Sequence, residues 1–146
     1  NITLQNTDEV SKLWHILWKK AKSISADEVK KYSIKVSSIK QKVKTLSGGN
    51  QQKVVLSKVL RKTPKLVILV EPTRGIDVGT KVEVYNIINE LANSGVGVIF
   101  ISSELPEIVN LCDRVLVMHR GKSMGILGRK DVNEENVIKL ATGVDM

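Results

Sequence analysis

The first third of the chain carries apolar residues at helical spacing between many lysines. Residues 8–23 place their apolar side chains on one helical face, and Asp8 is a suitable N-cap, so we predict a helix there. That face consists of Val10, Leu13, Trp14, Leu17 and Ala21. A second, short helix is predicted from Ser25, which forms a capping box with Glu28. Residues 36–44 alternate without a decisive period and fit either a strand or a loop.

A different pattern begins at Thr45, where amphipathic stretches alternate with continuous apolar runs. Ser47 is expected to cap a helix that Thr63-Pro64 stops. Its predicted apolar stripe is Val55, Leu56, Val59 and Leu60. The run "LVILV" at 66–70 predicts a strand that is buried on both faces.

The same alternation continues to the end of the chain. Asp77 is expected to cap a helix ended by Ser94-Gly95. Its predicted stripe is Val78, Val82, Tyr85, Ile88 and Leu91. A second buried strand at 96–101 and a short helix opened by Pro106 follow. "RVLVMH" and "SMGILG" flank "RGK" as a hairpin, and "NEENVIKLATG" is a helix capped by Asn133 and closed by Gly143. Helices that alternate with apolar strands predict an α/β fold, a parallel sheet layered with helices.

Composition narrows the possible classes of protein. The 146 residues are enough for one domain with a core, and the longest apolar runs are far too short to span a bilayer. The chain does not begin with Met, so we expect it to be cut from something longer. Cys112 is the only cysteine, which excludes an internal disulfide and indicates a reducing compartment. Cys112 and the histidines His15 and His119 are expected in packing or surface roles.

The formal net charge of +8 raises the question of nucleic-acid binding. Lysines occur along the whole chain, and only 3% of residues are aromatic, so few side chains could stack on bases. We therefore expect no nucleic-acid partner. A solvated lysine-rich surface, or a face near anionic lipid, accounts for the charge equally well.

Polar residues follow both predicted parallel strands. Glu71 comes directly after the strand at 66–70, and Ser102, Ser103 and Glu104 follow the strand at 96–101. Ligands of open parallel sheets gather beyond the carboxyl ends of the strands. A carboxylate at this edge could orient or deprotonate water beside a bound phosphate.

The Ser47-Gly48-Gly49 sequence lies at the start of the helix that Ser47 caps. A helix start exposes unpaired N–H groups with a partial positive charge, and glycines let a ligand approach them closely. For the tripeptide alone, a simple cap preceded by a flexible turn is the favoured interpretation, because such tripeptides are common in loops.

Three motifs in order give the chain a family resemblance. "LSGGNQQKV", "LVILVEPTRGIDVG" and "IFISSELPEI" resemble the ATP-binding subunits of ABC transporters, in particular the C-terminal nucleotide-binding half of tandem bacterial importers of the ribose, galactose and xylose type. The resemblance implies a P-loop NTPase-like ABC nucleotide-binding domain, of which this chain is a fragment. Residues 1–45 would be the remnant of the helical subdomain, and 46–146 the signature helix and the downstream half of the ATPase core.

The resemblance also implies roles for individual residues. The signature residues Ser47, Gly48, Gly49, Asn50 and Gln51 would bind ATP held by the opposite domain. Glu71 matches the catalytic carboxylate that polarises the attacking water. Asp77, with Gly75 and Ile76, matches the loop that couples the two domains, and Ser103 matches the switch position, where many members of the family carry histidine.

Two further departures from the family pattern concern binding of the nucleotide. No phosphate loop G-x-x-x-x-G-K-[ST] is present; "GKS" at 121–123 has Leu116 where the first glycine belongs and is expected to be a hairpin turn. Val70 replaces the aspartate that helps to hold Mg²⁺, and an isopropyl group offers no oxygen ligand, so we expect no metal ligand at this position.

By resemblance, the intact subunit would use ATP and Mg²⁺ as an ATPase that energises sugar import. Its partners would be a second nucleotide-binding domain, a transmembrane permease and, indirectly, a sugar-binding protein, at the cytoplasmic face of the membrane. Two alternatives remain: a catalytically degenerate half that only completes the partner domain's ATP site, and a soluble ABC ATPase without a permease. This chain alone is expected to hydrolyse ATP negligibly.

Overall fold

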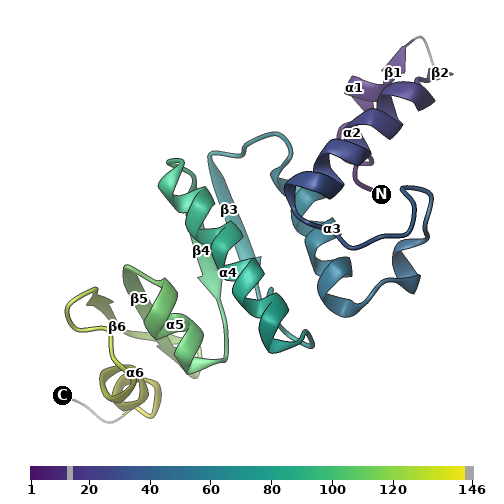
Figure 1. Ribbon diagram of the computed structural model, residues 1–146. Helices are drawn as coiled ribbons and strands as arrows, with labels where there is room; N and C mark the ends of the chain where they lie inside the picture. Colours follow the sequence, from purple (N-terminus) through teal and green to yellow (C-terminus); the bar gives the residue numbers. More distant parts are fainter. Residues whose placement is uncertain (13–14, 144–146) are drawn as a thin grey trace. The chain divides into compact units, whose positions relative to one another are not determined.

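The computed structural model describes residues 1–12 and 15–143, which are drawn in colour in Figure 1. The chain forms two compact units. The first comprises Asn1–Leu66 and Pro72–Gly97, and the second comprises Val67–Glu71 and Val98–Met146. The expected boundary at residue 45 concerns the subdomains of a larger fold and stays a prediction.

The N-terminal part of the first unit departs from the predicted helices. A short helix α1 (Thr7–Val10) leads into an antiparallel pair, β1 (Ser11–Lys12) and β2 (His15–Ile16), before helix α2 (Trp18–Lys31) begins. The prediction of one helix over 8–23 is therefore wrong. The N–H of Leu17 donates to the carbonyl of Val10 across the pair, at 2.6 Å, which turns the chain back on itself. Leu13 and Trp14, placed on the expected stripe, lie outside the described residues.

The separate helix predicted from Ser25 is also wrong, because α2 runs through this position without a break. The Ser25 hydroxyl donates to the carbonyl of Ala21 at 2.8 Å, one turn earlier in the same helix. A serine whose hydroxyl is bonded within the helix can sit in its interior instead of capping a new one. Residues 36–44 contain no strand; a 3₁₀ turn, η1 (Val43–Thr45), begins within them and precedes the next helix.

Helix α3 (Gly48–Leu60) begins where predicted, but it buries a different face. Leu56 and Leu60 are buried as expected, whereas Val55 and Val59 are exposed. The buried face also includes three residues that the apolar pattern missed: Lys53, Val54 and Ser57. The polar residues are tolerated there because they are hydrogen-bonded; the Ser57 hydroxyl, for instance, donates to the carbonyl of Val54 at 2.9 Å.

Helix α4 (Val78–Asn93) contacts α3 within the first unit. Its predicted ends are confirmed, because Asp77 caps its start and Ser94 and Gly95 close it, the latter with a φ of 87°. Its predicted stripe is only partly right. Ile88 is buried together with Val84, whereas Val78 and Val82 are exposed.

The strands β3 (Leu66–Val70) and β4 (Gly97–Ile101) pair with each other. The N–H of Gly97 donates to the carbonyl of Lys65 at one end, and the N–H of Glu71 donates to that of Ile101 at the other. The strands therefore run in the same direction, as predicted. The expected burial on both faces is wrong. Val67 and Leu69 are buried, and the alternating residues Leu66, Ile68 and Val70 are exposed, because successive side chains of a strand point to opposite faces.

The C-terminal part of the second unit follows the predictions. Helix α5 (Leu105–Leu111) carries Pro106 in its first turn, and strands β5 (Arg114–His119) and β6 (Lys122–Gly128) form an antiparallel hairpin. Arg120 and Gly121 connect them with positive φ angles of 47° and 77°, the geometry of a tight hairpin turn. Gly121 of "GKS" therefore lies in a hairpin turn, as expected, whereas Lys122 and Ser123 already belong to β6.

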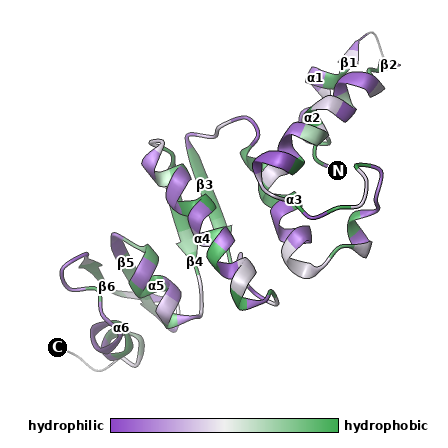
Figure 2. Cartoon of the chain, viewed as in Figure 1, coloured by the Kyte–Doolittle hydropathy of each residue, from purple (hydrophilic) through white to green (hydrophobic). Residues whose placement is uncertain are grey.

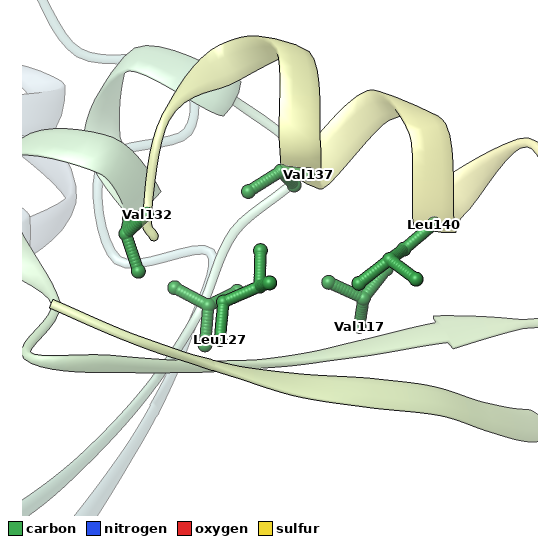
Figure 3. Close-up of a cluster of buried hydrophobic side chains, with 6 residues drawn as sticks. Val117, Leu127, Val132, Val137 and Leu140 are labelled. Atoms are coloured by element: carbon green, nitrogen blue, oxygen red, sulfur yellow. The ribbon is translucent and has the colours of Figure 1, made fainter. Parts of the chain in front are cut away.

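Helix α6 (Glu134–Ala141) covers this hairpin and completes a small core. Asn133 caps the helix by accepting a hydrogen bond from the N–H of Asn136, and Gly143 follows its end with a φ of 75°. Figure 3 shows side chains of α6 pointing towards those of the hairpin. The core cluster is Val115, Val117, Leu127, Val132, Val137 and Leu140. Cys112 packs against this cluster, which confirms the packing role predicted for it.

Candidate functional site

The start of helix α3 is held by a network around Ser47. The Ser47 hydroxyl oxygen accepts from the side-chain amide of Asn50 at 2.8 Å and, at 3.5 Å, from the backbone N–H of the same residue. The side-chain oxygen Oδ1 of Asn50 accepts from the N–H of Lys35 at 2.8 Å, and Gln51 donates its side-chain amide to the carbonyl of Leu46 at 2.8 Å. The side chains of Asn50 and Gln51 therefore hold the turn before α3 in place by hydrogen bonds.

This network leaves donors rather than acceptors at the helix start. A hydroxyl has two acceptor lone pairs and one hydrogen to donate, and Asn50 occupies both acceptor positions of Ser47. Within residues 1–12 and 15–143, no acceptor is recorded for the Ser47 hydroxyl or for the N–H groups of Gly48 and Gly49. Unpaired donors at the positive end of a helix dipole suit an anion such as a phosphoryl group.

The two glycines differ in what they contact. A Cβ built on Gly49 would lie 2.3 Å from the Cγ2 atom of Thr80 on α4, closer than any real contact. A Cβ on Gly48 would lie 3.3 Å from the carbonyl oxygen of Gly75, which is tighter than most contacts but not a clash. Packing of α3 against α4 therefore requires a residue without a Cβ atom at position 49, whereas position 48 is not restricted in this way.

Asp77 caps α4 beside this contact. One of its carboxylate oxygens accepts from the N–H of Thr80 at 2.9 Å, and the other accepts from the Thr80 hydroxyl at 2.8 Å. Both hydrogen bonds favour the charged carboxylate, and the side-chain bond to Thr80 has the largest effect in lowering the pKa of Asp77 below its ordinary value of 3.8. Thr80 thus links Asp77 of the predicted coupling loop to Gly49 of the predicted signature.

Lys53 is a residue of this site that the sequence analysis missed. Its side chain is 3% exposed, and its ammonium group donates to Glu83 of α4 and to the carbonyl of Ser33, both at 2.7 Å. A buried charge is stable only when it is paired and hydrogen-bonded, and here it ties α3 to α4 and to the end of α2. The signal was present in the sequence, because Lys53, Leu56 and Leu60 share one helical face at spacings of three and four residues.

A polar hollow of about 280 Å³ lies at the two helix starts. Its walls are entirely residues of the first unit. They include both charged partners of the α3–α4 pair and both helix caps: Lys35, Ser47, Asn50, Lys53, Asp77 and Glu83. The structure therefore brings Ser47, Asn50 and Asp77 together.

The other candidate residues lie at the ends of β3 and β4, in the second unit. Glu71 accepts a hydrogen bond from the N–H of Ser103 to its carboxylate at 2.8 Å, while its own N–H is bonded to Ile101. Glu71 also adopts a φ of 47°, which side-chain-bearing residues rarely do, and such strain is often found at functional sites. The structure thus joins the predicted catalytic carboxylate to the predicted switch position.

Neither of the strand-end residues next to this pair is a free metal ligand. Val70 is 64% exposed and has no oxygen to offer, and the Ser102 hydroxyl donates to the buried carboxylate of Glu107 at 2.7 Å. In the part of the chain that the structure describes, no group of three or more His, Cys, Asp or Glu could hold a metal ion. Val70 and Ser102 therefore offer Mg²⁺ no free oxygen ligand at this edge.

The other side chains that could react, Cys112 and His119, are held by contacts within the fold. Burial has the largest effect in raising the pKa of the Cys112 thiol, which disfavours the reactive thiolate. His119 Nδ1 lies 2.6 Å from the carbonyl of Ala141 at the end of α6. Of the described residues, no helix is long and apolar enough to cross a membrane.

Comparison with known proteins identifies the family. The sequence model of the ABC transporter family matches residues 3–74. The ribose import ATP-binding protein RbsA of Halalkalibacterium halodurans is 49% identical over 145 residues, which are 99% of this chain and 29% of that protein. The chain belongs to the ABC transporter family. The xylose import ATP-binding protein XylG of Geobacillus kaustophilus is also 49% identical, over 98% of this chain and 28% of its own length.

Solved structures of ABC transporters share the fold. An inward-facing metal-chelate type ABC transporter superposes with a TM-score of 0.78 at 14% identity, over 99% of this chain and 57% of its own. A nucleotide-free ATP-binding cassette superposes with a TM-score of 0.73 at 19% identity, over 94% and 57% respectively. These likenesses show the ABC ATPase fold. The family resemblance drawn from three motifs is thus confirmed, and it extends to residues 1–45, because the relatives match nearly the whole chain.

Proposed function

We propose that this chain is the signature-bearing part of an ATP-binding subunit that energises sugar import. The relatives at 49% identity are named as ribose and xylose import ATP-binding proteins, and the chain spans about 29% of their length. The observation that carries the proposal is the start of α3, where Ser47 has both acceptor positions filled by Asn50 and only its hydrogen left to donate.

In this proposal the α3 start binds the terminal phosphate of ATP held by a companion nucleotide-binding domain. The Ser47 hydroxyl and the N–H of Gly48 would donate to phosphate oxygens, and the helix dipole would stabilise their charge. Asn50 and Gln51 act indirectly, since their side chains hold the turn through Lys35 and Leu46. ATP supplies the phosphoryl group whose hydrolysis drives transport, and Asp77 lies on the surface proposed to meet the companion.

The second site, built on Glu71, would serve ATP bound to the subunit's own domain. Its carboxylate would orient the attacking water, and the N–H of Ser103 fixes where that carboxylate lies. Val70 favours a second candidate function, a degenerate site that binds Mg-ATP weakly while α3 still completes the companion's site. The partners we propose are a companion domain, a permease and, through it, a sugar-binding protein, at the cytoplasmic face of the membrane.

The test measures ATP turnover by the longer subunit in which we place this chain. Replacing Ser47 by Ala removes one donor to the developing charge, which at comparable sites lowers kcat by roughly 100-fold. Ser94→Ala, at the far end of α4, is the matched control and should leave turnover unchanged. Equal turnover of the Ser47→Ala variant and the parent protein would refute the proposed role of the α3 start.

Two further measurements separate the two candidate functions. Val70→Asp should raise Mg-ATP affinity and turnover if the local site is weakened only by the missing oxygen ligand. If neither the affinity nor the turnover changed, the chain would contribute to catalysis only through α3, at the companion's site. The isolated chain should hydrolyse ATP negligibly, and steady turnover above that of a Glu71→Gln variant would contradict this expectation.

A further inference from the structure

The net charge of the chain is concentrated in one segment, although lysines occur throughout. Residues 11–44, here called the basic segment, contain ten lysines, no arginine and only two acids, Asp27 and Glu28. Their net charge of +8 equals that of the whole chain, because the remaining residues carry thirteen basic and thirteen acidic side chains. A segment with a large positive charge, on a protein whose other charges cancel, indicates a negatively charged partner.

The lysines of the basic segment are all exposed, and those of α2 lie together on its outer side. Lys19, Lys22 and Lys30 share one face at spacings of three and eight residues, and Lys20 and Lys31 lie beside them, whereas Ala21 is buried on the other side. Figure 2 shows hydrophilic residues along α2. Among the described residues, none of the ten lysines forms an ion pair, so their charge is available.

An apolar cluster lies at the N-terminal end of the same helix. Trp18 is 66% exposed and is the one exposed aromatic side chain among the described residues. Ile16 and Leu17, directly before it, are exposed as well. Tryptophan beside aliphatic residues and lysines is typical of segments that lie at the boundary between lipid headgroups and acyl chains.

We propose that the basic segment binds the surface of a membrane that contains anionic lipid, with the lysines of α2 at the headgroups and Trp18 in the interfacial layer. Lysines attract anionic headgroups without a fixed geometry, and each one near the surface strengthens binding about fivefold. This inference goes beyond the proposed transport function, because it requires neither nucleotide nor a companion domain.

The composition of the basic segment favours lipid over nucleic acid. Arginine, with its planar fork of donors, is the usual residue for recognition of phosphates and bases, and the segment has none. Single-stranded nucleic acid is bound by several aromatic side chains that stack on bases, and here Tyr32 is buried and Trp18 is alone among the described residues of the segment.

The experiment measures binding of the full chain to vesicles of phosphatidylcholine with and without phosphatidylserine. We expect binding only when phosphatidylserine is present, and weaker binding as the salt concentration rises. In the Trp14→Phe variant Trp18 is the only tryptophan, and its fluorescence should shift to the blue on these vesicles. Lys19→Gln/Lys22→Gln/Lys30→Gln should weaken binding by about 100-fold.

The matched control removes the same charge elsewhere, in the variant Lys65→Gln/Lys122→Gln/Lys130→Gln, whose three lysines are also exposed. It should bind phosphatidylserine vesicles within about threefold of the parent chain, since these lysines lie outside the basic segment. Circular dichroism confirms that both variants are folded. Equal losses in the two variants, or equal binding to both kinds of vesicle, would overturn the proposal. Tighter binding to duplex DNA than to the anionic vesicles at the same salt concentration would overturn it in favour of a nucleic-acid partner.

Discussion

The two candidate sites of this chain hold their polar residues in opposite ways. At the starts of α3 and α4 hydrogen bonds join Asn50 to Ser47 and Asp77 to Thr80, and Gly49 leaves no room for even a methyl group beside Thr80. At the ends of β3 and β4 one hydrogen bond from Ser103 holds the carboxylate of Glu71, on a backbone with a φ of 47°. We therefore expect substitutions at the helix starts to change stability first, and substitutions at the strand ends to change chemistry first.

The largest effect is expected at Gly49, whose replacement tests how closely the helix starts are packed. Gly49→Ala places a methyl group 2.3 Å from the Thr80 Cγ2 atom, so α3 must move away from α4. Overpacking of this kind costs about 3 kcal/mol of the free energy of unfolding. Urea denaturation measures the loss.

Two variants show whether the contact with Thr80 causes that loss. Gly48→Ala is the control, because its new methyl group meets the Gly75 carbonyl oxygen at 3.3 Å and the Ile76 Cγ2 atom at 3.8 Å, and it should cost less than about 1 kcal/mol. Thr80→Ser removes the Cγ2 atom and keeps the hydroxyl that Asp77 accepts from, but its Oγ1 and Cβ atoms stay 2.7 and 2.9 Å from the new methyl group, so it should restore only part of the loss in Gly49→Ala. Equal losses for the two glycines would mean that packing does not distinguish them.

The next effect concerns the ion pair between the buried Lys53 and the exposed Glu83. Lys53→Met keeps the length of the side chain but removes the ammonium donor to Glu83 and to the Ser33 carbonyl, at a cost of about 2 kcal/mol. Lys58→Met on the same helix has no such partners recorded and should change the free energy of unfolding by less than about 0.5 kcal/mol. If the two variants were equally stable, the pair would not hold α3 to α4.

At the ends of β3 and β4 we expect a substitution to raise the free energy of unfolding instead of lowering it. Glycine adopts positive φ angles without strain, so Glu71→Gly should relieve the backbone while losing the exposed hydrogen bond from Ser103, for a net gain of about 0.5 kcal/mol. Arg120→Gly is the control at the same φ of 47° and should gain about 1 kcal/mol. A loss of stability in Glu71→Gly, alongside a gain in Arg120→Gly, would show that the carboxylate stabilises the fold.

The sequence predicted local features that depend on neighbouring residues, and it missed those that depend on partners far along the chain. The caps at Ser47, Asp77 and Asn133 and the turn at Arg120 and Gly121 were predictable because each is fixed within a few residues. Lys53 was missed because its partner Glu83 lies thirty residues away. The helix expected over 8–23 failed because helical spacing cannot exclude a return of the chain such as the bond from Leu17 to Val10.

The candidate site shows the same limit. Ser47 and Glu71 could be chosen from motifs, and so could Ser103, but the motifs could not show that Ser103 holds the Glu71 carboxylate through its backbone N–H. A glycine in a motif suggests access for a ligand, and this role of Gly49 stays a prediction. Only the position of Thr80 on the neighbouring helix reveals that packing requires it.

The smallest effect concerns two carboxylates whose pKa values are lowered for different reasons. The side-chain hydrogen bond from Thr80 contributes most to the lowered pKa of Asp77, and the ion pair with Lys62, at 2.9 Å, does so for Asp8. Because both folded pKa values lie below the ordinary 3.8, each group stabilises the fold at higher pH, and its contribution is lost as the pH falls below 3.8 towards the folded pKa.

Salt separates the two cases, because it screens charges but leaves hydrogen bonds to neutral groups intact. NMR titration in concentrated NaCl should therefore move the pKa of Asp8 back towards its ordinary value and leave that of Asp77 low. Thr80→Val, which removes the hydroxyl but keeps the shape, should raise the pKa of Asp77 at every salt concentration and leave Asp8 unchanged. A pKa of Asp77 that rose with salt as much as that of Asp8 would mean that a charged group, and not Thr80, holds the cap of α4 in its ionised form.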